Sequence, residues 1–188
     1  GAHANFWDGG RYAYLDCSFD DTLRMHIGAR PNGQALMIVD MWDPANVKEV
    51  ARWWVPGQRL SEEEEWKKWP FADQEGSWTA NHGGAVAPKR VEDGWTIAYT
   101  GFGRFGLYIL DLSDITKPKV LGRVANDLEG IGGIPYHSIY PVDGGPAYPR
   151  LQNLIITVPE THMADCREDW HTGYVIDVKD KRNPQIIG

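Results

Sequence analysis

The sequence of 188 residues is poor in several features that identify common classes of protein. Lysine and arginine number 19 against 26 aspartate and glutamate residues, and this net charge of −7, with no basic cluster, argues against a nucleic-acid partner. No apolar run approaches the roughly 20 residues of a membrane-spanning helix, and no basic-then-apolar signal segment opens the chain. The only two cysteines, Cys17 and Cys166, leave open whether they form a disulfide or remain free, and so they do not define the redox compartment.

Several catalytic and cofactor-binding motifs are missing as well. The glycine-rich segment 130–133 lacks the Gly-Lys-Ser/Thr ending of a phosphate-binding loop, and no helix pattern follows it. Segment 101–105 is flanked by strand patterns on both sides, which excludes a dinucleotide-binding turn. No Gly-x-Ser-x-Gly, His-Glu-x-x-His or Cys-x-x-Cys motif occurs, so none of these motifs identifies a reaction.

What the chain does contain is a strand motif that occurs three times. Hydrophobic residues make up 42% of the sequence, with nine Trp and eight Tyr, which is enough for the packed core of one domain. In segments 33–43, 105–114 and 172–180 a short apolar strand ends in Asp-x-x-Asp. The copies recur at intervals of about 70 residues, and such a period built from strands is typical of a propeller or another β array. We interpret the aspartates as acceptors for turn amides rather than as catalytic groups.

Around each strand motif the sequence predicts three further short strands, separated by turns of Gly, Asp and Pro. The predicted fold is therefore all-β, a β-propeller segment of three four-stranded blades. The blades cover about residues 1–55, 82–125 and 134–188, and an aromatic and acidic insertion covers about 56–81.

The segment Leu36-Met-Ile-Val-Asp40 and its two relatives resemble the repeat of the LVIVD-repeat β-propeller family, and the resemblance covers all three units. More distantly, the chain resembles the selenium-binding and methanethiol oxidase propellers, which implies a metal centre. Three blades cannot close a ring, because such rings typically need about 4–8 blades. We therefore expect a ring of six to eight blades, whose remainder belongs to the same longer chain or to a second copy.

One histidine, His3, His82 or His137, opens the first strand of each predicted blade. First strands surround the axis of a propeller, so equivalent positions on them converge. Three imidazoles at that point would form a site for a transition metal, Fe, Cu, Mn or Zn, with positions left for water or substrate. By analogy with the four-histidine iron site of the carotenoid-cleaving oxygenase propellers, a fourth ligand would lie outside this chain. The alternative is that each histidine bonds a neighbouring carbonyl or lines a polar channel.

Loops at the same end of the blades supply further candidates. Glu160 and His162 directly follow a predicted strand of the third blade. They are predicted to act as a general acid/base pair or to orient a metal-bound imidazole, and solvated loop positions are the alternative for both. Cys17 and Cys166 occupy corresponding places in blades that are not adjacent, which favours free thiols over a disulfide.

The insertion between the first two blades has its own pattern. Ser61 and Glu64 match a capping box, which predicts a short helix over 62–68. The segment is also unusually aromatic, with Trp66, Trp69, Phe71 and Trp78. These side chains indicate either a lid over an apolar substrate or a flap that packs on the edge of a blade.

These features predict a metal-dependent propeller enzyme, with His3, His82 and His137 as metal ligands. The first expectation is an oxidoreductase that acts on a small apolar or aromatic substrate, and hydrolase or lyase chemistry ranks second. The competing hypothesis is a non-catalytic β-propeller scaffold that binds a protein or ligand partner across its face.

Overall fold

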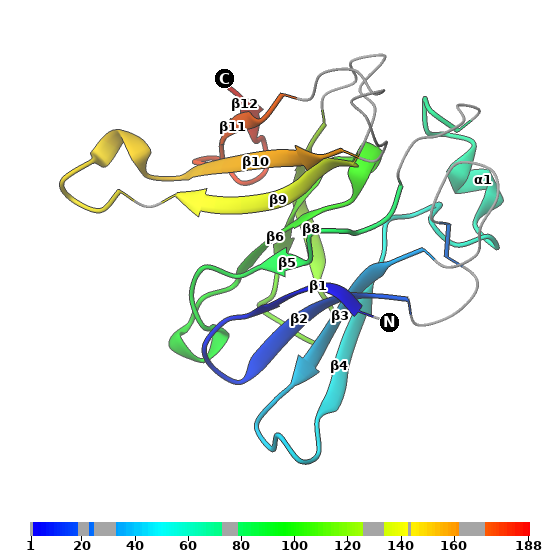
Figure 1. The fold of residues 1–188 in the computed structure, drawn as a ribbon, viewed down its shortest axis with the longest axis horizontal. Helices are drawn as coiled ribbons and strands as arrows, with labels where there is room; N and C mark the ends of the chain where they lie inside the picture. The colour runs from blue at the N-terminus through cyan, green and yellow to red at the C-terminus, as the bar shows by residue number, and fades with distance from the viewer. Residues whose placement is uncertain are drawn as a thin grey trace.

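The computed structural model describes residues 2–18, 23–24, 33–72, 79–125, 134–142, 144–161 and 172–188. Their strands form three four-stranded antiparallel sheets, arranged side by side as in Figure 1. Sheet I comprises β1 (Ala2–Trp7), β2 (Tyr12–Cys17), β3 (Ala35–Asp40) and β4 (Lys48–Trp53). Sheet II comprises β5 (Ala85–Val86), β6 (Ile97–Gly101), β7 (Leu107–Asp111) and β8 (Lys119–Val124). Sheet III comprises β9 (Ile134–Val142), β10 (Leu154–Glu160), β11 (Tyr174–Asp177) and β12 (Gln185–Ile186).

Each sheet follows the order of its strands along the chain, so its first strand forms one edge and its fourth strand the other. The prediction of an all-β chain with one four-stranded sheet per repeat is confirmed. The sheets do not close a ring within the described residues. No helix in the described part of the chain has the length and apolarity to span a membrane.

The Asp-x-x-Asp motif makes the same turn in all three sheets. Each aspartate accepts a hydrogen bond from the backbone amide two residues further on, at 2.8–3.1 Å, and this is the usual role of aspartate at a turn. The accepting residues are Asp40, Asp43, Asp111, Asp114, Asp177 and Asp180. Their carboxylates thus end the third strands and begin the turns to the fourth, as the sequence predicted.

The core lies between the sheets, and sheet II is buried on both of its faces. Along β7, Tyr108 and Leu110 belong to the cluster shared with sheet I, whereas Leu107 and Ile109 belong to the cluster shared with sheet III. This alternation follows from the two-residue period of a strand, because successive side chains point to opposite faces. All four side chains are buried, so β7 fixes the positions of both neighbouring sheets.

The insertion contains one turn of helix, α1 (Glu63–Trp66), which is shorter than predicted. The predicted capping box is wrong: the N-cap residue is Glu62, and no side chain caps the helix. The carboxylate of Glu62 instead accepts hydrogen bonds from Trp54 Nε1 at 3.0 Å and from the Gly57 amide at 2.8 Å. The contacts of Glu62 with residues outside the helix thus take the place of the predicted cap by Ser61.

The aromatic residues of the insertion that the structure describes pack into the core. Trp66 and Phe71 are buried, and Trp69 is half-buried. Their rings contact Phe105, in the loop between β6 and β7, with centroid separations of 6.1, 5.4 and 4.8 Å. This packing supports the flap interpretation for these three residues, and Trp78 lies outside the described residues.

Candidate metal centre

The structure brings His3, His82 and His137 together at the point where the three sheets meet. His3 lies in β1, His137 lies in β9, and His82 lies three residues before β5. Strand β5 contacts both β1 and β9, so the first strands of the three sheets adjoin one another. One ring nitrogen from each histidine lies within 4.8 Å of the others. The predicted convergence of the three positions is therefore present in the fold.

The three imidazoles differ in their exposure. The rings of His3 and His82 stack with their centroids 4.0 Å apart, and the ring of His137 lies 5.0 Å from that of His82. His82 is buried, His137 is half-buried and His3 is exposed. The cluster thus has a buried inner side and an open outer side.

Glu160, the last residue of β10, also reaches the cluster. Its Oε2 atom lies 3.1 Å from Nδ1 of His82 and 3.2 Å from Nε2 of His137. The sequence indicated a role for Glu160 because this residue follows a predicted strand. It gave no reason to expect that the carboxylate contacts two of the histidines. His162, its predicted acid/base partner, lies outside the described residues.

His137 is held in a defined orientation. Its Nδ1 atom lies 3.0 Å from Oγ of Ser138, and its Nε2 atom lies near the carboxylate of Glu160. Burial lowers the pKa of His137, while the negative charge of Glu160 opposes this shift. Nε2 of His137 is buried, and its contact with Glu160 lacks hydrogen-bond geometry. A neutral imidazole with a lone pair in this position is suited to bind a metal ion.

His3 is positioned by Asp16, a role that the sequence did not reveal. The register between β1 and β2 shifts between Ala2 and Asn5. At this irregularity Oδ1 of Asp16 accepts hydrogen bonds from the amides of His3, at 2.8 Å, and Ala4, at 2.6 Å. The Asp16 side chain is fully buried, and burial raises its pKa to about 6 although the two amides oppose the rise. A buried carboxylate therefore fixes the backbone that carries the exposed histidine.

Two glycines after His82 allow the three first strands to meet. A Cβ atom on Gly83 would lie 1.5 Å from the carbonyl oxygen of His137, so no larger residue fits without moving that strand. Gly84 has a φ of +70°, in the left-handed region that favours glycine, and lies against the carbonyl of Ala4. The His82-Gly83-Gly84 segment thus contacts both neighbouring strands.

A cavity of about 350 Å³ adjoins His137. It is lined by Gly83 and by residues of β1, β5 and β9, and no lysine, arginine, aspartate or glutamate is among the described residues that line it. Its apolar lining residues include Phe6, Val86, Ile139 and Tyr140. The polar cluster therefore opens onto an apolar space.

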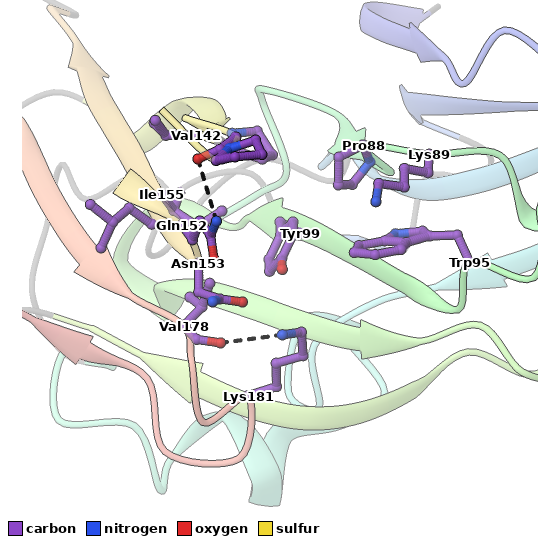
Figure 2. Close-up of a pocket in the computed structure, with 14 residues that line it drawn as sticks. Pro88, Lys89, Trp95, Tyr99, Val142, Gln152, Asn153, Ile155, Val178 and Lys181 are labelled. Atoms are coloured by element: carbon purple, nitrogen blue, oxygen red, sulfur yellow. Dashed lines mark hydrogen bonds between the residues drawn. The ribbon is translucent and has the colours of Figure 1, made fainter. Parts of the chain in front are cut away.

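A larger cavity of about 420 Å³ lies between sheets II and III (Figure 2). Trp95 and Tyr99 line it together with Lys89 and Lys181, and the Lys181 ammonium donates a hydrogen bond to the carbonyl of Val178. None of the three clustered histidines lines this cavity. We therefore place the candidate site at the histidines and not at this second cavity.

Cys17, the last residue of β2, is a buried free thiol, and Cys166 lies outside the described residues. Burial raises the pKa of Cys17, which disfavours the thiolate form that binds metals. Its sulfur lies 3.9 Å from the sulfur of Met37 and not in the histidine cluster.

The chain matches no protein-family model and no curated protein. The assignment of a function therefore depends on the fold and on the chemistry of the cluster.

Proposed function

We propose that the chain forms three blades of a β-propeller of the LVIVD-repeat type and that it is a metal-dependent enzyme. His3, His82 and His137 would hold a transition metal ion near the propeller axis. The observation that carries the proposal is the convergence of one imidazole from each of three repeats, with their nitrogens within 4.8 Å. Histidines at equivalent positions of a repeat share a site only if the repeats surround a common point.

The packing of the sheets supports the propeller. In β10, Ile155 faces the core shared with sheet II, so the alternating residues Ile156 and Val158 point to the opposite face. That face is open: Ile156 is 41% exposed, Val158 is 43% exposed, and Tyr140, which pairs with Ile156 across the strands, is 57% exposed. A row of apolar side chains on a sheet face is suited to pack against a further sheet. We propose that additional blades, from a longer chain or a second copy, cover it and complete a ring of six to eight.

The donor set supports a catalytic metal rather than a purely structural one. Structural sites are usually closed by four protein ligands, whereas catalytic sites keep a position for water or substrate. His3 is exposed, so the cluster is accessible from one side, and the neutral form of His137 is favoured by burial. Fe, Cu, Mn and Zn all accept imidazole ligands, and when bound the ion would supply a Lewis acid or activate water or dioxygen.

The adjoining cavity supports a small apolar or aromatic substrate. Its walls carry Phe6, Val86 and Ile139, and they would exclude water from the side of the cluster that Ser138 and His137 form. An apolar substrate that needs oxidation matches a redox-active ion, and on this basis we propose an oxidoreductase. A non-catalytic binding scaffold is the competing function, and it requires no metal at the histidines.

The proposal is tested by the metal content of the purified protein after reconstitution with Fe²⁺, Cu²⁺, Mn²⁺ and Zn²⁺ in turn. We expect near-stoichiometric binding of at least one ion, and its loss in His3→Ala and His82→Ala. Asn5→Ala is the matched control, because Asn5 is also exposed and lies in the same strand, β1. Equal metal content in the histidine variants and the control would leave the scaffold as the better account.

A further inference from the structure

We propose that Glu160 is the fourth ligand of this centre, so that the described chain itself supplies three imidazoles and one carboxylate. The inference rests on the proposed metal-dependent function and extends it. It replaces the expectation that the fourth ligand lies outside the chain, and it assigns Glu160 to metal binding instead of general acid/base catalysis.

The spacing of Glu160 from two of the histidines matches that of atoms bound to one ion, whereas the histidine nitrogens lie up to 4.8 Å from one another and would move closer on binding. Bonds from a metal ion to imidazole nitrogen or carboxylate oxygen are about 2.0–2.2 Å long, so two ligands lie about 3 Å apart at right angles and about 3.4 Å apart in a tetrahedron. Oε2 of Glu160 lies 3.1 Å from His82 Nδ1 and 3.2 Å from His137 Nε2. One carboxylate oxygen thus has this spacing to two of the proposed ligands at once.

A simple histidine–carboxylate pair explains the geometry less well. The Nε2 contact of His137 has the distance of a hydrogen bond but lacks its geometry, and Nδ1 of the same ring is already placed by Ser138. A carboxylate oxygen and a ring nitrogen at this distance, with no hydrogen bond between them, are expected where a cation contacts both atoms.

An irregularity in sheet III lies beside both groups. Val158 of β10 pairs with Ser138 of β9, and Glu160 pairs with Ile134. Two steps along β10 thus correspond to four along β9, so the extra residues lie in β9 and include His137. Such irregularities redirect side chains and are frequent beside functional sites.

The carboxylate also narrows the class of metal. A set of three nitrogens and one oxygen suits Mn²⁺, Fe²⁺, Zn²⁺ and Cu²⁺, whereas Cu⁺ prefers thiolate and thioether ligands. One carboxylate reduces the net charge of a site for a divalent ion and three neutral imidazoles to +1. The side chain of Glu160 is 41% exposed, so its outer edge leaves space for water or substrate beside the ion.

The test compares Mn²⁺ and Zn²⁺ affinities of the purified wild-type protein, Glu160→Gln, Glu160→Asp and His82→Ala. Removal of a partner that only orients a ligand costs about 10–100-fold in metal affinity, so loss of a direct anionic ligand in Glu160→Gln should weaken Mn²⁺ binding by about 100-fold or more. Zn²⁺ binding should weaken less, because three imidazoles and a water satisfy its tetrahedral geometry. Glu160→Asp retains the charge but is one methylene shorter, and should recover part of the loss.

Glu64→Gln is the matched control. It makes the same change of charge and shape on the exposed helix α1, where Glu64 pairs only with Lys67 in the structure's described residues. Its metal affinities should equal those of the wild type. The visible absorption of the Co²⁺-loaded protein, which reports the number and type of ligands, should change in Glu160→Gln and remain unchanged in Glu64→Gln.

The two proposals fail in different ways. Unchanged affinities and an unchanged Co²⁺ spectrum in Glu160→Gln, with binding lost in His82→Ala, would refute the ligand role of Glu160 and leave the histidine centre intact. A loss of up to about 100-fold with an unchanged Co²⁺ spectrum would also refute it, since this is the behaviour of an orienting residue. A wild-type protein that binds none of these ions would refute both proposals.

Discussion

Replacement of Asp16 by alanine should show whether this residue affects metal affinity separately from its effect on the stability of the fold. Asp16 accepts two backbone hydrogen bonds, from His3 at 2.8 Å and from Ala4 at 2.6 Å, at the irregular start of β1. An amide that loses its buried acceptor costs about 1–3 kcal/mol, although water can partly satisfy amides at an edge strand. Removal of a buried carboxylate, whose pKa is raised by desolvation, offsets part of this cost. We expect a net loss of about 1–2 kcal/mol in the free energy of unfolding.

The same substitution should reduce metal affinity by about 10–100-fold, because the backbone that carries His3 is no longer fixed. Asp16→Asn retains an oxygen that accepts from both amides, so its affinity and stability should stay close to wild type. Asp43→Ala is the control: it also removes an acceptor from a turn amide, that of Ala45, but it lies at the far end of β3 from Asp16. Urea unfolding gives the stabilities, and isothermal titration of the metal gives the affinities.

The reasoning about Asp16 would be refuted by two results. Wild-type metal affinity in Asp16→Ala, at any stability, would show that the two hydrogen bonds do not position His3. Equal losses of affinity in Asp16→Ala and Asp43→Ala would show that the effect follows general destabilisation and not the local geometry.

Three further predictions follow from the packing. Gly83→Ala should abolish the metal centre, because the new Cβ would lie 1.5 Å from the carbonyl oxygen of His137. The strand content measured by circular dichroism should remain largely intact. Wild-type metal content in this variant would contradict the prediction. Ile109→Ala should lower the free energy of unfolding in urea by about 2–5 kcal/mol, because Ile109 is fully buried between sheets II and III; a loss below 1 kcal/mol would contradict that burial. Burial raises the pKa of Tyr108 to about 12, above the value of about 10 in the unfolded chain, so the unfolded state loses its proton first and stability should fall between pH 10 and 12. Tyr108→Phe should remove about 2 kcal/mol of that pH dependence in urea titrations, and the exposed Tyr148→Phe should leave it unchanged; equal slopes for all three proteins would refute the assignment.

Much of the fold could be predicted because its signals are local. The third strands of the sheets, Ala35–Asp40, Leu107–Asp111 and Tyr174–Asp177, lie where the apolar segments before Asp-x-x-Asp placed them. Strand period and aspartate turns depend on residues close in sequence, so the chain carries their pattern directly. The repeat predicted one histidine at the start of each first strand, whereas His3 and His137 lie within β1 and β9 and His82 precedes β5. The adjoining first strands still bring the three histidines together, as predicted.

What could not be predicted depends on tertiary contacts and on strand irregularities. Two register shifts, the one that Asp16 stabilises in β1 and the one beside His137 in β9, have no sequence signature, because strand pairing is set by partners distant in the chain. The capping box failed for a related reason. Glu62, beside the predicted cap Ser61, bonds Trp54 and Gly57, and these contacts decide where the helix begins.

The central claim, that the three repeats hold one metal ion between their histidines, is tested most directly by anomalous X-ray diffraction. Crystals of the reconstituted protein would be measured at the absorption edge of the ion that it retains. We predict a single strong peak bounded by His3, Nδ1 of His82 and Nε2 of His137, with nitrogen distances of about 2.0–2.2 Å. A map without a peak at the histidines, or with its peak at another place, would contradict the account.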